Sequence, residues 1–239
     1  MYPEESVQNL CSSWWEEDDG KTICPGRLCR SFVPYVTQTP LTLIPEGRPN
    51  SIEHNIAEAS LEQMRIGQRR RLNLLPVAAL PLNAGELYAV YKAKRRPCLI
   101  LGDSWKELDQ KLAKGRPIFQ KTPVVTVAPF FGVEQDGSRA GFPPLFVERI
   151  RGLMYPQFFW DVLPHNGKES IMFFAHMQPV GRHHDSVELT NYKLSKEAFS
   201  LVSEWVSWYT TGQMPSGEND SLGEYRDLLQ ELQEPSRPA

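Results

Sequence analysis

Hydrophobic and polar residues alternate in several short stretches of the chain, which is the pattern of half-buried β-strands. The clearest stretch, residues 85–102, reads GELYAVYKAKRRPCLILG. Alternation over 87–91 predicts one strand, and the apolar run 97–101 predicts a second, more buried one. We place Lys94–Arg96 in a tight connection between them. Three cations at a hairpin tip attract an anion such as phosphate, and they are equally what a solvated turn contains.

Other strands are predicted by runs of β-branched and aromatic residues. These runs cover residues 122–131, 145–149 and 170–177. Asp136-Gly137, between the first two runs, is a hairpin-turn signal. The first 50 residues are less regular, with scattered prolines and one short strand candidate over 31–36.

Apolar residues at helical spacing predict helices over 51–71, 105–112 and 196–211. The last of these has the strongest signals, because Ser195 precedes it as an N-cap and a glycine follows it. A further short helix is expected over 221–232.

Many short strands with a helix packed at the end predict a mainly β fold of the α+β class, and specifically a small, strongly bent, SH3-like barrel. We expect residues 83–212 to form this barrel with its C-terminal helix. Residues 1–82 are expected to be an N-terminal extension packed on the core. Residues 213–239 are expected to be a C-terminal tail with one short helix.

The composition is ordinary for a globular protein, with 41% apolar and 23% charged residues. A net charge of −3 argues against a uniformly basic surface for nucleic acid, but it is compatible with a local basic groove. The chain contains no apolar run of the roughly 18 residues that a membrane span needs, and it begins without the apolar core of a secretory signal. Together with only four cysteines, these features predict a cytoplasmic protein.

Two sets of residues raise the question of a metal site. Cys11, Cys24 and Cys29 could join His54 around zinc, but four residues separate the cysteines of CPGRLC and no second pair follows. We therefore expect buried free thiols there. The sequence RHHD at 182–185 is more typical of an exposed polar loop than of a metal site. No metal and no cofactor are predicted.

An ordered series of segments resembles the MazF/PemK (Kid-type) toxin endoribonucleases. The resemblance covers roughly residues 84–211 and supports the SH3-like barrel. It rests on a Gly-Glu-aromatic strand start, an Arg-Pro before an apolar strand, a core strand, a later strand beginning with serine, and a Leu-Ser-x-Glu helix entry. These are Gly85–Tyr88, Arg96–Leu101, Val124–Pro129, Ser170–Phe174 and Leu194–Glu197.

This resemblance implies a metal-independent RNase, in which a 2′-OH attacks the adjacent phosphate. The arginine of Arg-Pro, here Arg96, would stabilise the phosphorane or assist proton transfer. Where the family has a threonine or serine as the partner of its arginine, this chain has Phe130-Phe131, so His176 is predicted to supply the acid/base group. The residues predicted to bind RNA or phosphate are Lys94, Arg95, Arg151 and Gln178.

A second function stays open beside the endoribonuclease: a degenerate barrel that acts as a protein-interaction module in a defence or regulatory complex. If Arg96, His176 and Gln178 share one open groove, catalysis is favoured; if Phe131 or the extension fills that groove, interaction is favoured. The resemblance implies RNA, an antitoxin or other protein, and a second copy of the chain as partners. We expect the aromatic residues of 155–160 to lie in the core or an interface rather than to stack on bases.

Overall fold

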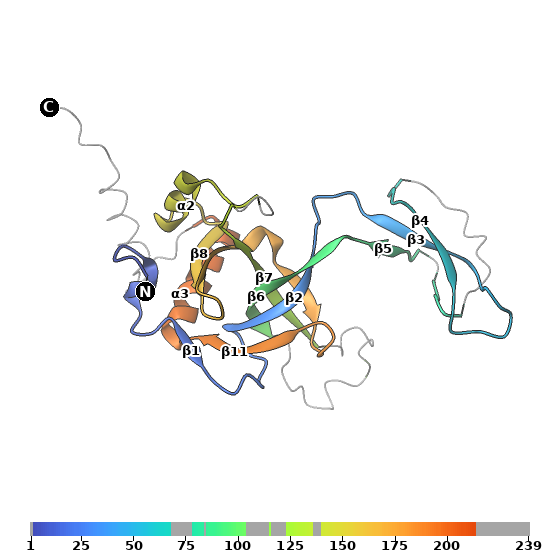
Figure 1. Ribbon diagram of the computed structural model, residues 1–239, viewed down its shortest axis with the longest axis horizontal. Helices are drawn as coiled ribbons and strands as arrows, with labels where there is room; N and C mark the ends of the chain where they lie inside the picture. Colours follow the sequence, from blue (N-terminus) through green and yellow to red (C-terminus); the bar gives the residue numbers. More distant parts are fainter. Residues whose placement is uncertain are drawn as a thin grey trace. The chain divides into compact units, whose positions relative to one another are not determined.

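The structure is a computed structural model, and two units make up the chain (Figure 1). One unit comprises residues 1–31 and 95–239, and the other comprises residues 32–94. The residues that the structure describes are 2–67, 78–83, 85–103, 115, 123–135 and 140–213.

The first unit is built on an eight-stranded sheet, which Figure 1 shows curled into a half-barrel. The strand order is β1-β11-β2-β6-β7-β9-β8, and β10 also pairs with β7. The strands are β1 (Trp15–Glu17), β2 (Arg27–Pro34), β6 (Ala93–Asp103), β7 (Val124–Gly132), β8 (Phe158–Leu163), β9 (Lys168–Phe173), β10 (Gln178–Gly181) and β11 (Glu188–Leu194). Its helices are the α-helices α2 (Pro144–Arg151) and α3 (Lys196–Thr211) and the 3₁₀ helices η1 (Val7–Leu10) and η3 (Phe174–His176). The mainly β fold predicted from the sequence is confirmed.

The strands β7, β9 and β8 carry a helix on each face. Because side chains alternate along a strand, Phe130 of β7 faces one way and its neighbour Phe131 the other. The Phe130 face packs on α3, where Trp205 meets Phe159 edge to face with ring centroids 4.8 Å apart. The opposite face packs on α2, whose Ile150 joins a separate apolar cluster. The sheet is therefore sandwiched between two helices at this point.

Helix α3 forms where the sequence predicts it, and its local signals explain why. The Ser195 hydroxyl oxygen accepts a hydrogen bond from the backbone N–H of Ala198 at 3.1 Å, which satisfies one of the free donors of the first turn. At the other end Gly212 has a left-handed φ of +71°, which a residue without a Cβ adopts without strain.

A buried carboxylate ties the N-terminal segment to β8. Asp161 is 1% exposed, and its Oδ1 accepts hydrogen bonds from the Tyr2 hydroxyl and from the Val162 N–H, both at 2.7 Å. Its Oδ2 accepts from the Trp14 indole N–H at 3.0 Å. The Trp14 ring also stacks on Phe159, with centroids 5.7 Å apart. Two donors, the Tyr2 hydroxyl and the Trp14 indole, and a ring stack thus hold the N-terminal segment on the core.

The second unit contains a small antiparallel sheet of order β4-β3-β5. Its strands are β3 (Leu41–Gly47), β4 (Glu58–Gln63) and β5 (Tyr88–Val90). Leu43 lies between Leu61 and Tyr88 in register, so these apolar side chains share one face of the sheet. Leu61 remains 55% exposed there.

Three predictions of local structure are wrong. The described part of the predicted helix 51–71 consists of turns followed by β4. The predicted strand 145–149 lies in α2, which begins with Pro144, a residue that suits the first turn of a helix. Lys94–Arg96 do not form a hairpin turn but lie within β6, because β5 pairs with β3 and β6 with β7.

The division of the chain also differs from the predicted one. Strands β1 and β2 come from the predicted extension, yet β1 pairs with β11, and β2 lies between β11 and β6 in the large sheet. The predicted strand 170–177 is a strand over its first part, followed by η3. The predicted helices 105–112 and 221–232 and the turn at Asp136-Gly137 lie outside the described residues. In the described part of the chain, no helix has both the length and the apolar character needed to cross a membrane.

Stability should depend on the ionisation of Asp161. Burial raises the pKa of this carboxyl to about 7, whereas an unfolded aspartate titrates near 4. The folded protein therefore holds the proton more tightly, and the stabilisation from protonated Asp161 is lost as the pH rises from about 4 to about 7. We expect the free energy of unfolding, measured in urea, to fall by roughly 2–3 kcal/mol from pH 5 to pH 8 through this group.

The variant Asp161→Asn cannot ionise, so that part of the pH dependence should disappear even if the variant is less stable at every pH. Equal slopes for the two proteins between pH 5 and pH 8 would contradict a raised pKa for Asp161.

Candidate functional site

Arg96 and His176, which lie 80 positions apart in the sequence, meet around the Phe131 ring. The guanidinium carbon of Arg96 is 4.1 Å from the centroid of this ring, and the His176 ring centroid is 5.5 Å from it. Phe173 completes the group, with its centroid 4.4 Å from that of His176 and 6.2 Å from that of Phe131. All four side chains are partly buried. We call these four residues the Arg96 platform.

Strand register creates this platform. Cys98 of β6 lies opposite Pro129 of β7, so the antiparallel pairing brings Arg96 beside Phe131. On the other edge of β7, Phe131 lies opposite Ile171 of β9. After β9 the chain turns into η3, which sets His176 against Phe173. The cation and the imidazole thus reach Phe131 from opposite edges of β7.

The charge state of His176 follows from these surroundings. Partial burial lowers the pKa of the imidazole, and the positive charge of Arg96 lowers it further. The ring is therefore neutral at pH 7, with one nitrogen that donates and one that accepts a hydrogen bond. The guanidinium of Arg96 lies over the Phe131 ring, and a guanidinium carries its N–H groups in its own plane. The platform combines a cation, aromatic rings and a neutral imidazole.

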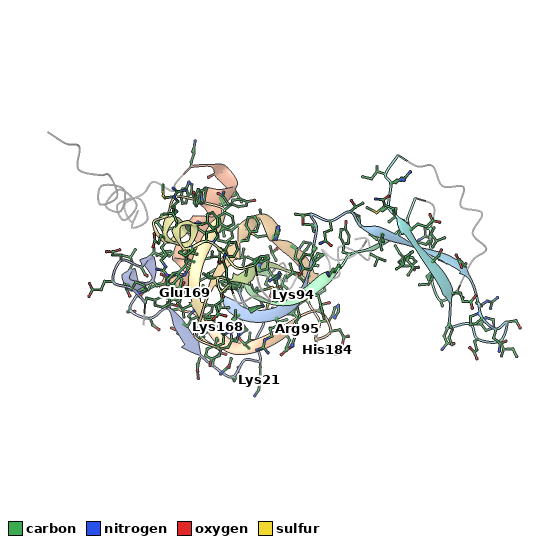
Figure 2. The ribbon with its side chains drawn as sticks, turned by 45° about the horizontal axis from the view of Figure 1, so that its top comes forward. Lys21, Lys94, Arg95, Lys168, Glu169 and His184 are labelled. Carbon is green, nitrogen blue, oxygen red and sulfur yellow. The ribbon has the colours of Figure 1, made fainter. Side chains whose placement is uncertain are left out.

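Arg95, labelled in Figure 2, directly precedes Arg96 on β6. Because neighbouring residues of a strand alternate, it lies on the opposite face of β6 from Arg96. Its guanidinium pairs with the carboxylate of Glu188, to which Arg30 also bonds at 3.1 Å. Lys94, the other predicted phosphate ligand on β6, belongs to the unit of residues 32–94. The structure thus separates Arg95 from the platform.

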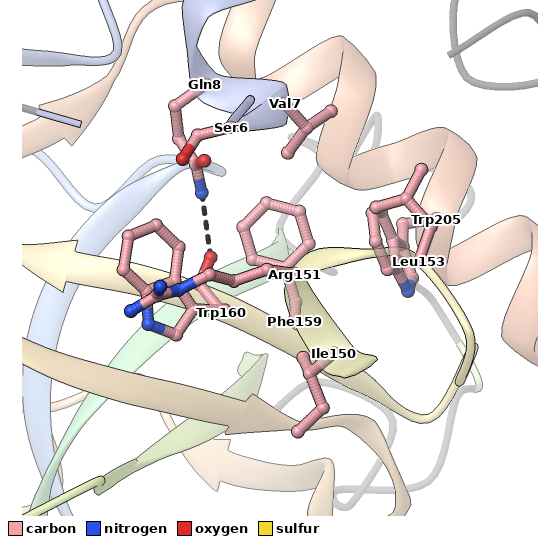
Figure 3. A pocket seen from close by; sticks show the side chains of 9 residues that line it. All are labelled: Ser6, Val7, Gln8, Ile150, Arg151, Leu153, Phe159, Trp160 and Trp205. Atoms are coloured by element: carbon pink, nitrogen blue, oxygen red, sulfur yellow. Dashed lines mark hydrogen bonds between the residues drawn. The ribbon is translucent and has the colours of Figure 1, made fainter. Parts of the chain in front are cut away.

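Arg151 and Gln178 also lie apart from Phe131. The guanidinium carbon of Arg151 sits 4.5 Å from the Trp160 ring centroid (Figure 3). Its Nη2 donates to Glu169 Oε2 at 2.9 Å. Gln178 pairs with Val127, which is four residues from Phe131 along β7 and so about 13 Å away. Among the six predicted site residues, Arg96 and His176 are the pair that contacts with the Phe131 ring bring together.

The sequence identified Phe131 as the residue in place of a catalytic side chain and as one that could fill the groove, but not as part of a binding surface, and it did not single out Phe173. Both residues follow the two-residue period of their strands, with Phe130 and Met172 buried on the opposite face. Applied to β7 and β9 together, this period places Phe131 and Phe173 on the same face of the sheet. It is the sequence signal that could have identified both residues.

The cysteines form no disulfide in the structure: all four are free thiols, with Cys29 and Cys98 buried. Burial raises the pKa of both buried thiols. Within the described ranges, no cluster of three or more His, Cys, Asp or Glu side chains could hold a metal ion.

Removing the charge of Arg96 should raise the pKa of His176. The variant Arg96→Gln eliminates the second cause of the shift and leaves partial burial, the larger cause, in place. We therefore expect the pKa of His176 to rise but to stay below the ordinary value near 6.5, as followed by the NMR shifts of the imidazole protons against pH. Arg95→Gln, an equal charge change on the other face of β6, should leave it unchanged. Equal shifts in both variants would contradict the contact geometry.

Comparison of this chain with models of known protein families, with curated proteins and with solved structures found no match.

Proposed function

We propose that the Arg96 platform binds single-stranded RNA and that the sheet carrying it is an SH3-like barrel of the MazF/PemK kind. The observation that supports this most is the guanidinium of Arg96, whose carbon lies 4.1 Å from the Phe131 ring centroid, beside a neutral imidazole. Proteins that bind single-stranded nucleic acids use such pairs, in which aromatic rings stack on bases and cations hold the backbone. The ordered sequence resemblance supports the same class of ligand.

Each member of the platform has a defined part in this proposal. A base stacks on one aromatic ring of the platform, and Arg96 binds the phosphate of the same nucleotide through its N–H groups. Neutral His176 can donate to or accept from a ribose hydroxyl or a base edge. A single strand is the expected form because bases in a duplex are stacked on one another and their faces are not accessible.

The overall charge fits a small binding site. With a net charge of −3, the protein cannot rely on bulk attraction to RNA. Arg96 supplies one phosphate contact, and the group of Arg30, Arg95 and Glu188 carries one further positive charge on another face. We therefore expect the affinity to fall only weakly with salt, with a slope of about −0.7 for one phosphate on a single strand.

Cleavage of RNA is the second candidate, and the neighbouring positions of Arg96 and His176 favour it. Neutral His176 could accept the proton of a 2′-OH while Arg96 stabilises the phosphorane that forms. The Phe131 ring, however, contacts both side chains and lies where a phosphate would have to reach both. Binding therefore requires no rearrangement of the platform, whereas cleavage requires Phe131 to move.

Affinity for a fluorescein-labelled single-stranded RNA, measured by fluorescence anisotropy, tests the proposal. Phe131→Leu removes a stacking surface and should weaken binding by about 5- to 100-fold, the range for loss of one stacked base. Arg96→Gln should weaken binding and reduce the salt slope. Arg95→Gln is the matched control: it has the same loss of charge, lies next to Arg96 in sequence and points to the opposite face.

The same RNA, run on a denaturing gel after incubation, separates binding from cleavage. Cleavage that is present in the wild type and absent in both Arg96→Gln and His176→Gln would establish the second candidate. Equal affinity of the wild type and of folded Phe131→Leu and Arg96→Gln, as judged by circular dichroism, would contradict RNA binding at the platform.

A further inference from the structure

A pocket of about 320 Å³ lies beside α2 and the end of β7. Apolar side chains, among them Val133, Phe142 and Val147, form part of its wall. Arg151, Glu148 and Glu169 provide polar groups to the same pocket. Its size is at the lower end of small-molecule sites, and apolar walls with a few polar groups are what such a site requires.

This pocket begins close to the Arg96 platform. Val133 is two residues beyond Phe131, and its N–H bonds to the carbonyl of Glu169, so the strand geometry continues past the end of β7. Two residues of a strand span about 7 Å and return to the same face of the sheet. Adjacent nucleotides of an extended strand can therefore occupy the platform and the pocket.

A row of aromatic rings joins the two places. Starting from Phe173 of the platform, consecutive ring centroids lie 4.6 Å, 5.3 Å and 5.8 Å apart. The rings in this row are Phe173, Phe158, Phe146 and Phe142. These side chains are partly buried, so the path from platform to pocket is aromatic and carries no charge of its own.

A glycine lets the segment before α2 pass close to the residues that follow β7. Gly141 has a φ of +54°, and a Cβ on it would lie 2.5 Å from the carbonyl oxygens of Val133 and Glu134. Its close approach lets the next residue, Phe142, donate its N–H to the Val133 carbonyl at 3.0 Å. The aromatic wall of the pocket is thereby fixed to the end of β7.

Two polar groups of the pocket, Arg151 and Glu169, are held in place by contacts with Trp160 and with each other. The Arg151 guanidinium stacks on Trp160 and bonds to Glu169, and Glu169 also accepts from the Trp160 indole at 3.2 Å. Glu148 is exposed and precedes Arg151 by three residues on α2, so the two share one face of the helix. The pocket thus offers a positioned donor and a carboxylate acceptor next to apolar walls.

We propose that this pocket binds a guanine base of the RNA strand that occupies the platform, an inference that rests on the function proposed above. Guanine presents two adjacent N–H donors, on N1 and N2, which match the carboxylate of Glu148. Its O6 and N7 are acceptors, and arginine is their usual partner. Adenine lacks this combination, and uracil lacks the second donor and the size. Glu148 and Arg151 of α2 therefore give the pocket its preference for guanine.

A set of labelled RNA pentamers tests this pocket by fluorescence anisotropy. The set contains a uridine pentamer, variants with one guanosine at each position in turn, and the corresponding adenosine and inosine variants. One guanosine variant should bind about ten-fold more tightly than the uridine pentamer, as expected for one good bidentate contact. Inosine, which lacks the N2 amino group, should give a smaller gain, and adenosine should give none.

Two variants locate the preference. Glu148→Gln should lose the gain from guanosine and leave the affinity for the uridine pentamer unchanged. Arg96→Gln should weaken all pentamers by the same factor and preserve their ratio. Glu5→Gln, an exposed acid in the N-terminal segment, is the control for a change of one charge.

The outcomes separate the two proposals. Arg96-dependent binding without a guanosine preference would contradict guanine binding in the pocket, but it would leave RNA binding by the platform supported. A preference that persists in Glu148→Gln, or that favours another base, would also overturn the pocket. No binding of any pentamer would overturn both.

Discussion

The two-residue period of β7, fixed by pairing on both of its edges, is the constraint on which the rest of the first unit depends. β6 pairs along one edge, and β10 and then β9 pair along the other. With this register Phe130 faces the α3 core, where it is 2% exposed, and Phe131 faces the platform. A shift of the β7 register by one residue would turn Phe131 toward the α3 core and Phe130 toward the platform. It would thereby bring an apolar core residue to the surface. The same register thus determines which side chains are buried in the α3 core and which side chains form the candidate site.

The contacts of the platform favour the proposed binding over catalysis in physical terms. A guanidinium over an aromatic ring gains roughly 0.5–2 kcal/mol and keeps its N–H groups directed outward. That arrangement suits a phosphate on the edge of Arg96 and a base on the neighbouring rings. It does not suit a reaction in which Arg96 and His176 act on one phosphorus, since the ring of Phe131 contacts them both. Phe131, which stands where the resemblance would place a catalytic hydroxyl, is therefore also the residue that favours the proposed binding.

How much the sequence could predict depended on whether the signals were local. Helix α3 follows from Ser195 and Gly212, β6 follows from its continuous apolar run, and β7 follows from its β-branched and aromatic residues. The predicted helix at 51–71 failed because the helical spacing of Ile52 and Ile56 corresponds to no buried stripe: they are 80% and 44% exposed. The partners of β1 and β2 lie far along the chain, so no local pattern could reveal them. Arg96 and His176 were predicted from the resemblance, whereas the position of the Phe131 ring between them follows only from the pairing of the strands.

An NMR titration of the isotope-labelled protein with a single-stranded RNA tests the central claim most directly, because it locates the contact on the sheet. The account predicts that the largest changes fall on the backbone amides of Arg96 and Phe131 and on the His176 ring. The indole signals of Trp205 and Trp208, which lie on α3 behind the opposite face, should stay in place. Changes concentrated on α3, or none on β6, β7 and η3 at saturating RNA, would contradict it.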